Sequence, residues 1–110
     1  MRKVIVTEAD TLRACLALLR VHPRVAWAER INSGVRGGVR FGFPGCPDIL
    51  GQLKDGRVLA VEVKGPLGRA TAAQVRFLTL VRRWGGVSGV VRSTADLEAL
   101  IRLMTLVQHG

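Results

Sequence analysis

The sequence has few cysteines, few histidines and no long apolar run, and each shortage excludes a class of protein. Cys15 and Cys46 are the only cysteines, and without a framework spacing they exclude a disulfide-stapled secreted domain and favour reduced thiols in a cytosolic compartment. His22 and His109 lie far apart in the chain, so no zinc-ligand spacing is present. No signal peptide, lipid motif or apolar segment of membrane-spanning length occurs, and we expect no membrane partner.

Acidic residues are also scarce. Seventeen Lys and Arg stand against eight Asp and Glu, which gives a formal net charge of +9. Several of those acids belong to the candidate site described below, so the remaining surface is more basic than the total suggests. Such a surface favours a polyanionic partner, and nucleic acid is the usual one for so small a chain. An ordinary solvated surface with a ribosome-like charge bias is the alternative.

The length of 110 residues predicts one domain, 1–110, that buries roughly two-thirds of its unfolded surface. Apolar periodicity predicts three helices, with capping boxes formed by Thr7 with Asp10 and by Ser93 with Asp96 and a cap at Thr71, and a set of strands between them. This order predicts an α/β fold in which a mixed β-sheet is flanked by helices, with a further helix at the C-terminus. The predicted helices run from Thr7 to about Arg20, from Thr71 to about Trp84 and onward from Ser93. The predicted strands are 24–31, with Val25 and Trp27 at period 2 and so on one face, a hairpin around 54–56, and 87–92.

The stretch Val61-Glu62-Val63-Lys64 carries the chemistry that we expect of this chain. Side chains alternate between the two faces of a strand, so Glu62 and Lys64 share one face while Val61 and Val63 share the other. The carboxylate and the amine are therefore predicted to be neighbours.

A second acid, Asp48, joins this pair only in one hairpin register. A three-residue loop at 54–56, with its glycine in the left-handed conformation of a G1 bulge, places Asp48 opposite Glu62 on the same face. A two-residue loop would instead place Asp48 opposite Val63 and separate the carboxylates. We predict the three-residue loop.

Two adjacent carboxylates repel each other unless a cation lies between them, and hard oxygen ligands suit Mg²⁺ or Mn²⁺. Lys64 could hold or help to deprotonate an attacking water, while the ion stabilises charge that develops on a phosphate. Metal-dependent cleavage of a phosphodiester is the function that this pattern indicates. An exposed hairpin with a solvated Glu/Lys pair is the competing interpretation, because Glu-x-Lys alone is common in strands.

Two further polar residues have two interpretations each. Glu8 continues the inward stripe of the first helix, as a further acid of the site would, yet a Glu in a first turn commonly just complements the helix dipole at the surface. Gln74 lies in the first turn of the second predicted helix, where it could point at the phosphate or simply lie at the edge of the core.

Several arginines are candidates for contacts with a phosphate backbone. Arg36 and Arg40 lie in the glycine-rich segment 32–45, which is predicted to be a loop; it could close over nucleic acid or act as a flexible connector. Arg69 follows the Glu-x-Lys strand, and Arg76 lies on the second helix; both could contact phosphate or be merely solvated.

Together these residues resemble the PD-(D/E)-x-K nuclease superfamily, and within it the VRR-NUC branch of virus-type replication-repair nucleases in its stand-alone phage or bacterial form. Asp48, Glu62 and Lys64 are the specific part of the resemblance, which extends over most of the chain. Supporting residues are Glu8, Trp27, Arg30-Ile31-Asn32-Ser33-Gly34, Gly45-Cys46-Pro47-Asp48-Ile49, Gly65, Gly68, Thr71, Gln74, Phe77-Leu78, Gly85-Gly86 and Val90-Val91-Arg92-Ser93.

The resemblance implies a restriction-endonuclease-like αβββαβ core and a cytoplasmic enzyme of a bacterium or a phage-infected cell. It also implies a homodimeric DNA endonuclease of repair or recombination that acts on branched DNA such as a Holliday junction rather than on a small molecule. A non-catalytic basic module that binds nucleic acid, and the same chemistry on RNA, remain open. The implied site comprises the catalytic residues Glu8, Asp48, Glu62, Lys64 and Gln74, with Mg²⁺ or Mn²⁺ held by Asp48, Glu62, Glu8 and the Val63 carbonyl.

The predicted C-terminal helix is more apolar than a single buried face needs, which favours a dimer contact. Extra packing in the core of a monomer is the alternative. The apolar residues concerned are Leu97, Leu100, Ile101, Leu103, Met104, Leu106 and Val107.

Overall fold

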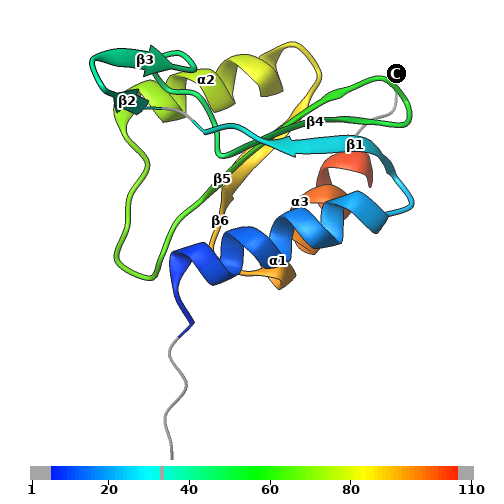
Figure 1. Ribbon diagram of the computed structural model, residues 1–110. Coiled ribbons are helices and arrows are strands. Elements are labelled where there is room, and N and C mark those ends of the chain that lie inside the picture. The colour runs from blue at the N-terminus through cyan, green and yellow to red at the C-terminus, as the bar shows by residue number, and fades with distance from the viewer. Residues whose placement is uncertain (1–5, 33, 107–110) are drawn as a thin grey trace, which may run out of the picture.

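The computed structural model describes residues 6–32 and 34–106 (Figure 1). The first helix is followed by five strands and then by a helix, a strand and a final helix. In order the elements are α1 (Glu8–Val21), β1 (Val25–Arg30), β2 (Gly34–Arg36), β3 (Val39–Phe41), β4 (Ile49–Leu53), β5 (Val58–Val63), α2 (Ala72–Arg83), β6 (Val87–Val91) and α3 (Thr94–Leu106).

Four strands form one mixed sheet in the order β1-β4-β5-β6. The pairs β1/β4 and β4/β5 are antiparallel, whereas β5 and β6 are parallel and joined through α2. Helix α2 covers one face of the sheet, and α1 and α3 pack beside each other on the other face (Figure 1). This is the predicted α/β architecture, an αβββαβ core followed by a C-terminal helix.

The main hydrophobic core lies between the sheet and the α1/α3 layer. Leu12, Cys15 and Leu19 of α1, at helical spacing, meet the alternate residues Val61 and Val63 of β5, and all five are buried. Because side chains of a strand alternate, the residue between those valines must point to the opposite face, toward the α2 layer. That residue is Glu62.

The starts of α1 and α2 are fixed by capping boxes; the sequence predicts the whole box at Thr7 but only the cap residue Thr71 for α2. Thr7 accepts a hydrogen bond from the Asp10 N–H, and Thr71 accepts one from the Gln74 N–H; in each box the later side chain bonds back to the cap. These reciprocal bonds satisfy donors that a helix start otherwise leaves free.

The predicted capping box of α3 is only half formed. Ser93 Oγ accepts a hydrogen bond from the Asp96 N–H at 3.0 Å, as expected. The Asp96 carboxylate, however, accepts from the N–H of Arg92 rather than from that of Ser93. The helix still begins where the sequence predicts.

The β4–β5 hairpin has the predicted three-residue loop. The Leu53 N–H donates to the Arg57 carbonyl at 2.8 Å, and Gly56 has a φ of +97°, in the left-handed region. Ile49 pairs with Val61, so the next position outward sets Asp48 opposite Glu62. The register on which the candidate site depends is confirmed.

Strand β1 differs from the prediction that Val25 and Trp27 lie on one face. The pairing with β4 shifts between these two residues, because Ala26 is an extra residue that forms a β-bulge. Val25 and Ala28 are therefore buried, while Trp27 is 45% exposed and donates its indole N–H to Gln52 at 3.0 Å. The period-2 expectation was wrong at this point.

The glycine-rich segment 32–45 is also more ordered than the loop that was predicted. Strands β2 and β3 pair as a separate antiparallel hairpin, and Gly37 and Gly38 form its turn with φ of +56° and +78°. Two consecutive positive φ values are what a two-residue hairpin turn needs, and glycine adopts them without strain.

The apolar residues of α3 divide between core and surface. Leu97 and Ile101 are buried, Leu100 and Met104 pack against the core, and Leu103 is 57% exposed. Val107 of the predicted stripe lies outside the described residues. Within residues 6–32 and 34–106, no helix is both long and apolar enough to span a membrane.

Gly45, just before the Cys46-Pro47-Asp48 segment, should tolerate no side chain. Its φ is +81°, and a Cβ built on it would lie 2.3 Å from the Ala73 carbonyl oxygen of α2. We expect Gly45→Ala to lower the free energy of unfolding by at least about 2 kcal/mol in urea titrations. Gly37→Ala is the matched control, because Gly37 has a φ of +56° but nothing within 4 Å of its Cβ position. Equal losses in the two variants would contradict the steric explanation.

Candidate active site

Asp48 and Glu62 meet at one end of the β4–β5 pair. Asp48 directly precedes β4, and its Oδ2 accepts a hydrogen bond from the Val63 N–H at 2.8 Å. Glu62 is only 2% exposed. The bond to β5 fixes the Asp48 carboxylate beside Glu62, so the predicted acidic pair is present.

The environment of Glu62 strongly favours its protonated form. Burial, then a hydrogen bond with the Asp48 side chain and the charge of Asp48, raise the pKa of Glu62 from its ordinary value of 4.5 to about 8. The Lys64 charge lowers this pKa and the Glu8 charge raises it, but both effects are smaller. Glu62 Oε2 is buried and has no hydrogen-bond partner among the described residues. Among the described residues, no cation or hydrogen-bond donor therefore reaches this oxygen.

Lys64 lies beside Glu62, as the strand alternation predicts. Its Nζ is 3.7 Å from Glu62 Oε1, and its side chain is 17% exposed. The Lys64 N–H donates to the Val91 carbonyl at 3.0 Å, which holds the backbone of this residue against β6. The amine is thus held between a buried carboxylate and the surface, where it can reach a water or a phosphate.

Glu8 reaches this end of the sheet from the first turn of α1. Its Oε1 accepts a hydrogen bond from the Gly65 N–H at 2.9 Å, directly after Lys64. The Gly65 carbonyl in turn accepts from the Arg92 guanidinium, so side chains from α1 and from the end of β6 hold both polar groups of Gly65. Glu8 therefore holds the backbone next to Lys64, and its role as an acid of the metal site stays a prediction. Arg92 is a contact that the sequence reasoning missed.

Gln74 forms hydrogen bonds at the start of α2, which neither predicted interpretation, a phosphate contact or a residue at the edge of the core, includes. Its Oε1 accepts a hydrogen bond from the Thr71 N–H at 2.8 Å, and its own N–H donates to Thr71 Oγ1 at 3.2 Å. The side chain therefore caps α2. A contact with phosphate remains a prediction.

Of the four predicted arginines, Arg69 and Arg76 have described side chains, and the two line different grooves. The side chains of Arg36 and Arg40 lie outside the described part of the structure, although their backbones belong to β2 and β3. Arg69 lines a groove beside the loop that follows Lys64. Arg76 lies on the exposed side of α2, next to Thr79 and Leu80. Their contacts with nucleic acid stay predictions.

Cys46 is a neighbour of the acidic pair that the sequence reasoning did not include. Burial raises the pKa of its thiol, and the charges of Glu62 and Asp48 act in the same direction. The Cys46 N–H donates to the Phe43 carbonyl at 2.9 Å, and the Phe43 ring packs on Phe77 of α2 with centroids 4.9 Å apart. These contacts anchor the segment before Asp48 to α2. Its position two residues before the acid was the available signal.

The acidic pair fits a hydrated divalent cation better than a cage made by protein alone. Among the described residues, no group of three or more His, Cys, Asp and Glu side chains gathers closely enough to hold a metal. Mg²⁺ commonly uses one or two carboxylates and keeps several waters. The unpartnered Glu62 Oε2 and the raised pKa of Glu62 indicate the place where a cation would supply the lacking charge.

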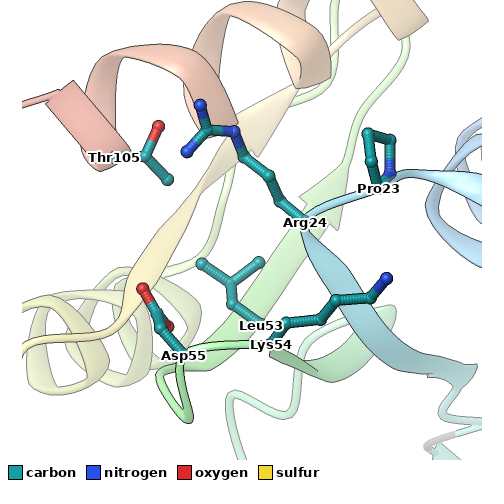
Figure 2. Close-up of a pocket in the computed structure, with 6 residues that line it drawn as sticks. All are labelled: Pro23, Arg24, Leu53, Lys54, Asp55 and Thr105. Atoms are coloured by element: carbon teal, nitrogen blue, oxygen red, sulfur yellow. The ribbon is translucent and has the colours of Figure 1, made fainter.

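A small pocket at the opposite end of the β4–β5 hairpin is separate from this site (Figure 2). Its volume is about 210 Å³, and its only acid, Asp55, forms an ion pair with Arg57 at 2.8 Å. None of the predicted site residues lines it. The lining residues are Pro23, Arg24, Leu53, Lys54, Asp55 and Thr105.

No protein-family model matches this chain, and no curated protein or solved structure matches it either. A functional assignment therefore depends on the residues and the geometry described above.

The raised pKa of Glu62 predicts a pH-dependent stability. Folded Glu62 keeps a proton that the unfolded chain releases above pH 4.5, so the free energy of unfolding should fall as pH rises from about 4.5 to about 8. The loss attributable to Glu62 is at most about 1.4 kcal/mol per pH unit. Urea unfolding of wild type and of Glu62→Gln at several pH values isolates this loss, because the amide cannot titrate. Parallel pH profiles for the two proteins would contradict the assignment.

Proposed function

We propose that this protein is a metal-dependent DNA endonuclease that hydrolyses phosphodiester bonds. The observation that carries the proposal is the buried Glu62, whose Oε2 has no partner among the described residues, beside Asp48 and 3.7 Å from the Lys64 amine. Two carboxylates and an amine in one site suit metal-assisted attack of water on a phosphate. The competing interpretation, an exposed hairpin with a solvated Glu/Lys pair, does not fit the burial of Glu62, which is 2% exposed.

In this mechanism Asp48 and Glu62, with the Val63 carbonyl, would hold Mg²⁺ or Mn²⁺. The bound ion supplies Lewis-acid stabilisation of the charge that develops on the phosphate. The hydrogen bond between Asp48 and the Val63 N–H keeps the Asp48 carboxylate oriented toward Glu62. Loss of the Glu62 proton on metal binding leaves both carboxylates ionised, as ligands must be.

Lys64 would orient the attacking water and stabilise the hydroxide that forms as the water's proton passes to solvent, since its amine is beside the carboxylate pair. Glu8 acts mainly through the backbone, because its hydrogen bond to the Gly65 N–H holds the chain directly after Lys64. On the VRR-NUC resemblance we also propose that Glu8 would bind a second metal ion or a water of that ion. In-line attack forms a new P–O bond as the P–O bond to the leaving oxygen breaks, and the leaving oxygen takes a proton from solvent.

The charge distribution supports DNA as the substrate. The formal net charge is +9, and three of the eight acids, Glu8, Asp48 and Glu62, gather at the site, so the rest of the surface is strongly basic. Specificity for branched DNA such as a Holliday junction, and a homodimer that offers one site to each of two strands, are proposed on the VRR-NUC resemblance. The exposed Leu103 of α3 is available for such a dimer contact.

We also propose that the enzyme acts in the cytoplasm of a bacterium or a phage-infected cell. Cys15 and Cys46 are both free and buried, which suits a reducing compartment.

Cleavage of labelled DNA tests the proposal. We expect the purified protein to cut a four-way junction with Mg²⁺ or Mn²⁺ but not with EDTA, in preference to a plain duplex or a single strand. Lys64→Met, which keeps most of the aliphatic stem, should lower the rate by about 100-fold or more because the amine is lost. Lys54→Met is the matched control, since Lys54 is exposed at the opposite end of the hairpin.

Other outcomes distinguish the alternatives. Tight binding of DNA with no cleavage in any metal would leave a non-catalytic basic module and refute the proposed activity. Faster cleavage of an RNA strand of the same sequence would assign the chemistry to RNA, since no described residue of the site is positioned to read a 2′-hydroxyl.

A further inference from the structure

A groove lies directly beside the candidate active site. It is formed by the loop 66–70, by Val75 of α2, by Val90 of β6 and by Arg92, and its volume is about 520 Å³. Strand β6 is at the edge of the four-stranded sheet, so the groove opens at the side of the molecule. This size is within the range of sites that hold one small ligand or one building block of a polymer.

The groove and Lys64 share a wall. Gly68 lines the groove, and a Cβ built on Gly68 would lie 3.5 Å from both the Cβ and the Cδ of Lys64. The Gly68 N–H also donates to the Gly65 carbonyl at 3.1 Å, which closes the loop tightly after Lys64. A substrate strand held at Lys64 therefore passes the groove within about one nucleotide's length.

The charged side chains of the groove suit phosphate. Arg69 and Arg92 line it, and among the described residues no acidic side chain does. The Arg92 guanidinium donates to the Gly65 carbonyl, which orients its planar fork and leaves further N–H donors for a ligand. Arginine in such a fixed position is well matched to the oxygen atoms of a phosphate.

The remaining wall is unusually apolar for an exposed surface. Leu67 is 96% exposed, Val75 is 49% exposed and Val90 is 38% exposed. Apolar side chains next to arginines match a nucleotide, which has an anionic phosphate and a flat, weakly polar base. A base offers its face to such a wall only when it is unpaired and out of its stack.

We infer that this groove binds an unpaired nucleotide of the substrate strand, next to the phosphate that is cleaved. Arg69 and Arg92 bind its phosphate, and Leu67, Val75 and Val90 contact its base. The inference builds on the proposed nuclease function and narrows its substrate class. The preferred DNA has, at the cleavage position, a nucleotide that is unpaired or that can unpair at a branch point, and a continuous duplex does not.

Fluorescence anisotropy in EDTA tests the groove without any cleavage. Two labelled DNAs of equal length are compared, a duplex with a single-stranded tail and a fully paired duplex. Wild type should bind the tailed DNA more tightly. Leu67→Ser should weaken binding of the tailed DNA by about fivefold to tenfold and leave binding of the paired duplex unchanged. Val21→Ser is the matched control, because Val21 is 79% exposed at the end of α1, away from the groove.

A second variant tests the phosphate contact. Arg69→Ala should weaken binding of the tailed DNA and reduce the slope of log Kd against log salt concentration by about one. Arg102→Ala removes the same charge from α3, on the opposite face of the sheet, and should keep the wild-type preference for the tailed DNA.

An unchanged affinity of Leu67→Ser for the tailed DNA, or an equal loss for both DNAs, would overturn the inference. Sedimentation of the free proteins tests whether a second copy of this chain occupies the groove instead. If wild type is a dimer and Leu67→Ser is a monomer with unaltered DNA binding, the groove is assigned to the second copy. If Leu67→Ser loses the preference for tailed DNA and the wild type cleaves no DNA, the groove is supported and the nuclease function is refuted. If the wild type cleaves DNA but shows no preference for tailed DNA, the nuclease function is supported and the inference about the groove is refuted.

Discussion

The pairing register of β4 and β5 is the constraint on which the candidate site depends. A three-residue loop that closes between Leu53 and Arg57 sets Asp48 opposite Glu62, and the Asp48 carboxylate then accepts the Val63 N–H. A slip of one residue would turn every side chain of the strand to the other face. It would expose Val61 and Val63, so the hydrophobic core enforces the same register that the acidic pair requires.

The core that fixes Glu62 also isolates it. Because its neighbours along β5 are buried against α1, Glu62 points into the α2 layer, where Cys46 and the Asp48 carboxylate surround it. An ionised carboxylate in such a place is costly without a positive partner, and Lys64 at 3.7 Å offsets only part of this cost. Stability and the proposed activity therefore make opposite demands on Glu62: the folded apo-protein favours the acid, whereas a metal ion favours the carboxylate.

Much of this arrangement could be predicted from the sequence because it follows from local rules. The capping box at Thr7, the cap residue Thr71, the glycine of the hairpin turn and the alternation along β5 each depend on residues a few positions apart. The bulge at Ala26 could not be predicted, since it depends on how β1 pairs with a strand that is distant in sequence. The hydrogen bond from Arg92 to the Gly65 carbonyl and the cap formed by Gln74 could not be predicted. Spacing in the sequence indicates on which face of a helix or strand a side chain lies, but packing decides which group it bonds.

The central claim is that Asp48 and a protonated Glu62 form a site for a divalent cation, and calorimetric titration with Mg²⁺ tests it most directly. Titrations at neutral pH in two buffers of different ionisation enthalpy measure both the binding and the protons that it releases. We predict binding with release of up to about one proton per ion, and no comparable binding by Asp48→Asn, whose amide oxygen can still accept the Val63 N–H. Absence of binding to wild type, or binding that releases no proton and survives in Asp48→Asn, would contradict the account.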